Sequence, residues 1–127
     1  MKKIINTPHA PAPIGAYSQA VLSGNTLFTS GQVAIDPASG ELITENITAE
    51  TTRVMENLKA VLKEAGMGFE DVVKSSIFIS DMANFGSINA VYSNYFEEAT
   101  APARETVEVA NLPKYVNVEI SMIAVKE

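Results

Sequence analysis

The chain contains no cysteine among its 127 residues. Disulfide bonds, thiolate nucleophiles and cysteine-ligated zinc sites are therefore excluded. The only histidine, His9, lies in the proline-rich segment 9–13. A lone histidine cannot build a histidine-based metal site, and a solvated loop residue is the favoured interpretation of His9. The sequence predicts no metal site.

Long apolar runs and a basic stripe are also missing. No stretch approaches the roughly 20 apolar residues of a membrane-spanning helix, and Ile4 and Ile5 are too few for the apolar core of a signal peptide. We therefore expect a cytoplasmic protein without membrane contact.

The formal net charge is −6 and the nine Lys and Arg residues are scattered, whereas nucleic-acid-binding proteins usually present a basic stripe to the phosphates. Nucleic acid is thus an unfavoured partner.

Sequence signatures of nucleotide-binding and serine-hydrolase sites are absent as well. The segment Gly66-Met67-Gly68 lacks the third glycine of a dinucleotide fingerprint and follows a predicted helix instead of a strand. No G-x-S-x-G motif marks a serine nucleophile. The sequence therefore predicts no cofactor and no classical hydrolase site.

What is present is typical of one globular domain of the α/β (α+β) class over residues 1–127. Hydrophobic residues make up 46% and charged residues 19% of the chain, as in soluble globular proteins, and the length suggests one domain. Hydrophobic periodicity predicts helices over residues 49–65 and from 84 or 85 to about 98. Alternation and turn residues predict a short first strand and five more, at 17–22, 26–33, 72–80, 103–109 and 116–125.

Each predicted helix has a single apolar stripe, so both can pack on the same face of one six-stranded, mostly antiparallel sheet. Thr48 is the expected N-cap of the first helix, and Gly66 ends it. Two helices cannot cover both faces of a sheet that size. On the last strand Asn117, Glu119 and Ser121 share a face with apolar residues. The composition of this face therefore matches neither a buried core nor a solvent-exposed surface. Such a face often packs against another subunit and leaves room for a polar pocket, and we predict an oligomer.

Arg104 and Glu119 are the candidate site residues that the pattern itself offers. Arg104 lies near the start of an apolar strand, where its guanidinium can hold a carboxylate or a phosphate. An ion pair with an acidic neighbour is the alternative, and spacing alone favours it. For Glu119 the pattern alone favours a solvent-facing residue on an alternating strand. If the last two strands pair antiparallel, Arg104 and Glu119 could share a sheet face, at a distance that depends on the register.

Short motifs follow one another in a characteristic order along the whole chain. They are residues 12–20 (APIGAYSQA), residues 27–32 (LFTSGQ), Asp36-Pro37, Gly40-Glu41, Asn57-Leu58, Ala65-Gly66, Asn89-Ala90-Val91-Tyr92, Tyr95-Phe96, Pro102-Ala103-Arg104, Leu112-Pro113-Lys114 and Val118-Glu119-Ile120. No single motif is diagnostic. Their joint order and spacing resemble the YjgF/RidA family, the reactive intermediate imine deaminases.

The resemblance implies a chorismate-mutase-like fold and a homotrimer, with sheets inside, helices outside and active sites in clefts between subunits. It implies hydrolysis of 2-iminobutanoate and 2-iminopropanoate to 2-keto acids and ammonia. By the same resemblance, Arg104 holds the substrate carboxylate and Glu119 positions the attacking water. The other substrate-binding positions that it implies are Tyr17, Ser30, Gly31, Asn89 and Thr106.

Two positions depart from the family pattern. Glu105 stands where close relatives usually have a small residue, and a pair with Arg104 would compete with a substrate carboxylate. Because adjacent side chains of a strand point to opposite faces, we expect Glu105 to leave Arg104 free. Thr106 stands where close relatives often have a cysteine. By the resemblance, the backbone groups at this position face the ligand.

Two other functions stand beside the deaminase. The same cleft could hold a keto acid or another small carboxylate without turnover, as a non-catalytic binding module. An endoribonuclease or translation inhibitor, an activity attached to parts of the family, is the less favoured alternative. The net charge of −6 and the lack of a His–Glu or His–Lys acid–base pair disfavour it.

Overall fold

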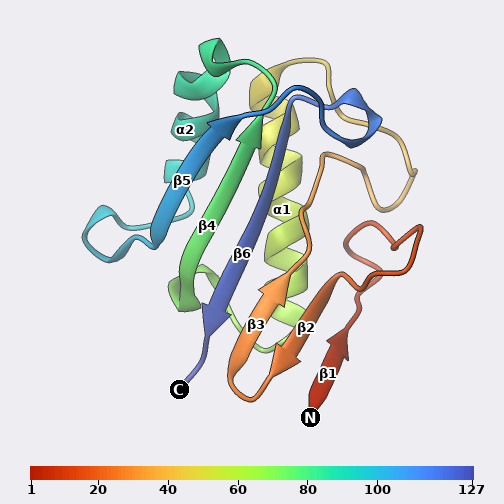
Figure 1. Cartoon of the computed structure of the whole chain (residues 1–127), viewed down its shortest axis with the longest axis vertical. Coiled ribbons are helices and arrows are strands. Elements are labelled where there is room, and N and C mark those ends of the chain that lie inside the picture. Colours follow the sequence, from red (N-terminus) through yellow and green to blue (C-terminus); the bar gives the residue numbers. More distant parts are fainter.

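The computed structural model describes residues 1–127 as a six-stranded sheet with two helices (Figure 1). The helices are α1 (Ile47–Glu64) and α2 (Phe85–Ser93). Short 3-10 turns form η1 (Phe69–Asp71), η2 (Met82–Asn84), η3 (Glu98–Thr100) and η4 (Pro113–Tyr115). The strands are β1 (Lys2–Ile5), β2 (Ala20–Ser23), β3 (Thr26–Thr29), β4 (Val72–Ile79), β5 (Ala103–Glu108) and β6 (Val118–Val125).

The strands lie in the order β1-β2-β3-β6-β4-β5, and only the β4–β5 pair is parallel. Both helices lie behind the sheet in Figure 1, so one face is covered and the other is open. The predicted α+β class, with a mostly antiparallel six-stranded sheet and two helices on one face, is confirmed. Neither helix has the length and apolar character needed to cross a membrane.

The covered face of the sheet forms the core. Alternate residues of β6 are buried beneath the helices, namely Val118, Ile120, Met122 and Ala124. From α1 the buried apolar residues recur at helical spacing, namely Val54, Met55, Leu58, Val61 and Leu62. The intervening residues of β6, Glu119 among them, are only half-buried on the open face. The predicted alternation of this strand is therefore confirmed.

Helix α1 begins earlier than predicted, because Asn46 and not Thr48 is its N-cap. The Asn46 Oδ1 atom accepts a hydrogen bond from the backbone N–H of Ala49 at 2.8 Å. Thr48 lies inside the first turn, where its carbonyl oxygen accepts a bond from the Thr52 hydroxyl at 2.8 Å. Asparagine caps as well as threonine or better. Gly66, with φ at +75°, ends the helix as predicted.

Several elements are shorter than predicted, β3 and α2 most of all. The strands expected at 17–22 and 26–33 become β2 and β3, with four residues each. The chain leaves the ladder after β3, and Gln32 alone returns to β6, through backbone bonds of 2.8 and 3.1 Å with Ile120. Helix α2 stops at Ser93 and not near residue 98, because the N–H groups of Asn94 and Tyr95 bond three residues back instead of four.

The last two strands do not pair with each other. β4 lies between them, parallel to β5 and antiparallel to β6. In this register Arg104 is the partner of Ser75, which is buried on the covered face, and Glu119 is the partner of Phe78 on the open face. The pairing under which Arg104 and Glu119 could share a face is therefore not formed, and the two residues lie on opposite faces. A strand inserted between their strands decides the register that sequence alone left open.

Candidate functional site

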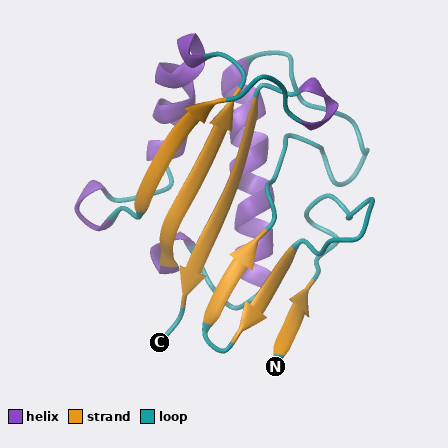
Figure 2. Ribbon diagram, in the orientation of Figure 1, coloured by secondary structure: helices purple, strands orange, loops and turns teal.

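The predicted site residues form two groups on the two faces of the sheet. The glutamate group, Tyr17, Ser30, Gly31 and Glu119, lies where the loops that follow β1 and β3 meet β6. These loops leave the same end of the sheet (Figure 2). The arginine group, Arg104, Thr106 and Asn89, lies where the edge strand β5 meets α2.

In the glutamate group, Glu119 lies directly against the backbone of Gly31. A Cβ atom on Gly31 would stand 2.5 Å from Oε2 and 2.6 Å from Cδ of Glu119. This close approach follows from the bridge between Gln32 and Ile120, which holds the two segments side by side. Burial raises the pKa of the Glu119 carboxyl above its usual range. A raised pKa makes the ionised carboxylate a stronger proton acceptor.

Ser30 and Tyr17 complete the glutamate group from the loops. The Ser30 hydroxyl donates to the Ser18 carbonyl oxygen at 2.5 Å, so it ties the two loops together. Tyr17 is exposed and lines a pocket of about 330 Å³ together with Gly31 and Lys114. From the sequence, Lys114 was named only within the motif Leu112-Pro113-Lys114 and not as a site residue. Its backbone has a left-handed φ of 56°, a strained conformation for a residue with a Cβ atom, which the motif by itself does not indicate.

The wall of this pocket depends on Gln19, which is buried. Its Oε1 atom accepts from the Thr7 N–H at 2.7 Å, and its Nε2 atom donates to the carbonyl oxygens of Thr7, Ala10 and Pro11 at 2.9 to 3.2 Å. One side chain thus satisfies backbone groups of residues 7–11, which lie outside every strand. Tyr17 and its loop are held in place by this anchor.

In the arginine group, Arg104 is free of carboxylates. Its Nη1 atom donates to Asn89 Oδ1 at 2.7 Å, and neither of the chain's two salt bridges involves it. Glu105 points to the other face, where it pairs with Lys74 at 3.0 Å and accepts a hydrogen bond from Ser76. These contacts lower the pKa of Glu105, the Ser76 hydrogen bond most of all. The expectation that Glu105 leaves Arg104 free is confirmed.

Two further features surround Arg104. The Thr106 hydroxyl is buried and has no hydrogen-bond partner in the chain, which leaves its hydrogen-bonding capacity open. The rings of Phe85 and Tyr92 lie beside the guanidinium, with their centroids 5.7 and 5.0 Å from Cζ. From the sequence, both rings were predicted only as part of the apolar stripe of a helix. Their spacing with Asn89, four and three residues apart, was the available signal that all three share a helix face.

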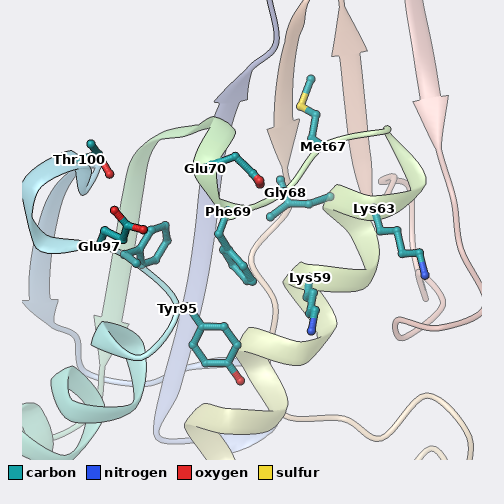
Figure 3. Close-up of a pocket in the computed structure, with 11 residues that line it drawn as sticks. Lys59, Lys63, Met67, Gly68, Phe69, Glu70, Tyr95, Glu97 and Thr100 are labelled. Carbon is teal, nitrogen blue, oxygen red and sulfur yellow. The ribbon is translucent and has the colours of Figure 1, made fainter.

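A separate hollow lies on the helix side of the molecule (Figure 3). It measures about 570 Å³ and lies where the end of α1 meets η1 and the segment that follows α2. Phe69, Tyr95 and Phe96 give it an aromatic wall, and Lys59 and Lys63 come from α1. None of the predicted site residues lines it, so the volume of a hollow does not identify the site in this molecule.

Comparison with known proteins places this geometry in a family. The model of the family described as Endoribonuclease L-PSP matches residues 7–126. A RutC family protein from Synechocystis is 52% identical over 97% of this chain and 95% of its own length. The rat 2-iminobutanoate/2-iminopropanoate deaminase is 44% identical over 99% of this chain and 91% of its own length.

A solved structure agrees with these relatives. The structure of TdcF from E. coli with bound serine has a TM-score of 0.93 and 42% sequence identity, and the match covers 98% of this chain and 99% of TdcF. The family match, the relatives and the fold thus agree over nearly the whole chain. The chain belongs to the YjgF/RidA family, also described as the Endoribonuclease L-PSP family.

Proposed function

We propose that this chain hydrolyses 2-imino acids, such as 2-iminobutanoate and 2-iminopropanoate, to 2-keto acids and ammonia. The observation that carries the proposal is the state of Arg104. Its guanidinium is oriented by Asn89, has no carboxylate partner in the chain, and lies on the same strand face as the unpartnered Thr106 hydroxyl. The name of the rat relative and the serine bound to TdcF support a small substrate with a carboxylate.

The proposed reaction needs only positioned water and an oriented carboxylate. Arg104 binds the substrate carboxylate in a bidentate pair, which fixes the adjacent C=N carbon for attack. Water held by Glu119 adds to this carbon of the protonated imine, the electron pair of the C=N bond moves to nitrogen, and Glu119 accepts a proton from the water. Glu119 then returns this proton to the amino nitrogen of the carbinolamine. The C–N bond breaks and releases ammonia, while the hydroxyl loses its proton to solvent and becomes the carbonyl group of the 2-keto acid. Tyr17, which lines the pocket beside Gly31, bounds the size of the substrate side chain.

We infer that the complete site forms between copies of the chain in a homotrimer. Arg104 and Glu119 lie on opposite faces of one sheet, so one copy cannot present both to the same small substrate. The open face also carries large apolar side chains with half their surface exposed, such as Phe28 at 48%. Contact with another copy would remove that surface from water.

The alternatives differ in what they require. A non-catalytic binding module would use the same Arg104 to hold a keto acid without turnover. The endoribonuclease activity in the family's description would need acid–base groups at a phosphate. His9 is the only histidine, and it lines a hollow with Arg53 and Lys59 that contains no member of either site group.

The experiment that tests this proposal measures how quickly the imine disappears. A threonine dehydratase generates 2-iminobutanoate in situ, semicarbazide traps the imine that remains, and wild type is compared with Arg104→Ala. We expect wild type to clear the imine faster than free hydrolysis and Arg104→Ala to lose at least ~100-fold of that activity, as expected when an orienting contact is removed. Arg53→Ala is the matched control, because Arg53 is the only other arginine.

Each result has one meaning. Loss in Arg104→Ala but not in Arg53→Ala supports the deaminase and the role of Arg104. No clearance by wild type, combined with measurable binding of 2-oxobutanoate, would favour the binding module. Full activity in Arg104→Ala would sink the proposed site.

A further inference from the structure

The Arg104 guanidinium is contacted by three residues on one face of α2. Asn89 accepts from Nη1 at 2.7 Å, and the ring centroids of Tyr92 and Phe85 lie 5.0 and 5.7 Å from Cζ. Both ring distances are in the range of cation–π contacts. Helix α2 thus orients Arg104, although Arg104 lies exposed on the edge strand β5.

Tyr92 is the one member of this set that is also tied to the strands. Its hydroxyl donates to Ser75 Oγ at 2.8 Å, and Ser75 is the register partner of Arg104 in the β4–β5 pair. Tyr92 and Ser75 are both buried, and the Tyr92 ring packs against Phe96 at 4.7 Å. The ring that faces the guanidinium is therefore fixed at its hydroxyl end to the strand beside Arg104.

Burial keeps this connection in one protonation state. It raises the pKa of the Tyr92 hydroxyl, although the Ser75 hydrogen bond and the charge of Arg104 oppose the shift. The hydroxyl thus stays protonated and remains a donor to Ser75 at neutral pH. The connection from Ser75 on β4 through Tyr92 to Arg104 is therefore retained at neutral pH.

We propose that Tyr92 is a positioning residue for Arg104, whose ring and Ser75 anchor fix the guanidinium before the substrate arrives. Asn89 uses one donor of the guanidinium, and the Tyr92 ring restricts its rotation, so the remaining donors face a carboxylate without further ordering. Such preorganisation lowers the cost of binding. This role rests on the proposed function, because that function gives Arg104 its carboxylate.

The composition of the chain allows a direct test of positioning. Arg53 and Arg104 are the only arginines, so a nitrogen-15 NMR spectrum contains two guanidinium Nε–H signals, assigned by Arg104→Lys. Arg53 donates through Nε to Asn57 on α1 at 3.1 Å and serves as the internal reference. We expect the order parameter of Arg104 Nε–H to fall in Tyr92→Leu, and by less in Tyr92→Phe, while that of Arg53 stays constant.

Binding of 2-oxobutanoate, measured by calorimetry, gives the second readout. We expect Kd to rise about 10-fold in Tyr92→Leu through loss of the ring contact and about 3-fold in Tyr92→Phe through loss of the hydroxyl bond. Ser75→Ala should match Tyr92→Phe, and the double variant should add nothing further, because both changes remove the same bond. Tyr95→Phe is the matched control, since the Tyr95 hydroxyl bonds Glu56 on α1 at 2.7 Å.

The outcomes separate this role from the proposed function. A purely structural Tyr92 would lower the melting temperature without changing the Arg104 order parameter, and that result would overturn the proposal. Equal affinity losses in Tyr92→Phe and Tyr95→Phe would overturn it too. Tyr92→Phe keeps the buried ring, so the test stands even if Tyr92→Leu fails to fold. If wild type neither clears 2-iminobutanoate nor binds 2-oxobutanoate, the proposed function fails, whereas the NMR measurement still decides the role of Tyr92.

Discussion

Gly31 leaves space that the Glu119 carboxylate fills. Because a Cβ atom at position 31 would stand 2.5 Å from Oε2 of Glu119, Gly31→Ala must displace this carboxylate. The displaced atoms belong to the end of a flexible side chain, so we expect the melting temperature to change little. A displacement of about 1 Å costs on the order of 100-fold in rate, and we expect kcat for imine hydrolysis to fall by that amount.

The matched control for Gly31→Ala is Gly86→Ala on α2, where an added Cβ meets nothing within 4 Å. We expect this variant to keep the wild-type rate. Steady-state kinetics on both variants, with circular dichroism as a check of folding, measures the difference. A Gly31→Ala enzyme with the wild-type kcat would remove the Glu119 position from the mechanism.

The raised pKa of Glu119 sets the expected pH dependence of the reaction. Burial favours the neutral carboxyl, whereas a carboxyl that accepts a proton from water must first be ionised. We therefore expect kcat/KM to rise with pH through a range above that of an ordinary glutamate. Glu119→Gln should lose both the activity and this rising limb. If Glu119→Gln keeps a rising limb of kcat/KM at the same pH, a group other than Glu119 is responsible for that limb.

The raised pKa of Glu119 affects stability in the opposite direction, because stability falls as pH rises whereas activity increases. Because the folded state favours the neutral form of Glu119, this group's contribution is fully present below its unfolded-state pKa and is lost as pH rises through the higher folded-state pKa. Melting temperatures of wild type and Glu119→Gln, measured against pH, test this sign. We expect the wild type to lose stability relative to Glu119→Gln as pH rises across that window.

At the scale of the element, the start of α1 depends on one side chain. Asn46 accepts from the Ala49 N–H, so Asn46→Ala removes the N-cap bond and should lower the free energy of unfolding by about 1 kcal/mol. Thr48→Ala is the control, because the Thr48 side chain is exposed and is not the cap. Urea unfolding of both variants measures the difference. A larger loss in Thr48→Ala would restore the N-cap that the sequence predicted.

At the scale of the whole molecule, the opposite placement of Arg104 and Glu119 predicts complementation between subunits. Arg104→Ala and Glu119→Gln should each be inactive alone. Unfolded together and refolded at equal amounts, they should regain about a quarter of the wild-type activity, because half of the subunits supply each intact residue to a site shared between copies. The imine assay on the mixture measures this recovery, and no recovery would contradict a site between subunits.

Local patterns in the sequence predicted much of the fold. The apolar spacing of α1, the alternation along β6 and the left-handed Gly66 depend on residues close in the chain, and all three are confirmed. Element ends were predicted less well. The cap at Asn46 and the early end of α2 depend on competition between neighbouring hydrogen bonds, in which several residues are chemically equivalent.

By itself, the sequence determined the class of the fold, the two faces of each strand and the family motifs, because these follow from periodicity and from residue identity. Only the tertiary structure decided how the faces of different strands are matched. The insertion of β4 between β5 and β6 places Arg104 under α2 and Glu119 on the open face. Side-chain alternation specifies the faces within a strand, whereas strand order depends on contacts between segments far apart in the chain. For the same reason, only the structure brings Tyr92 and Ser75 together beside Arg104.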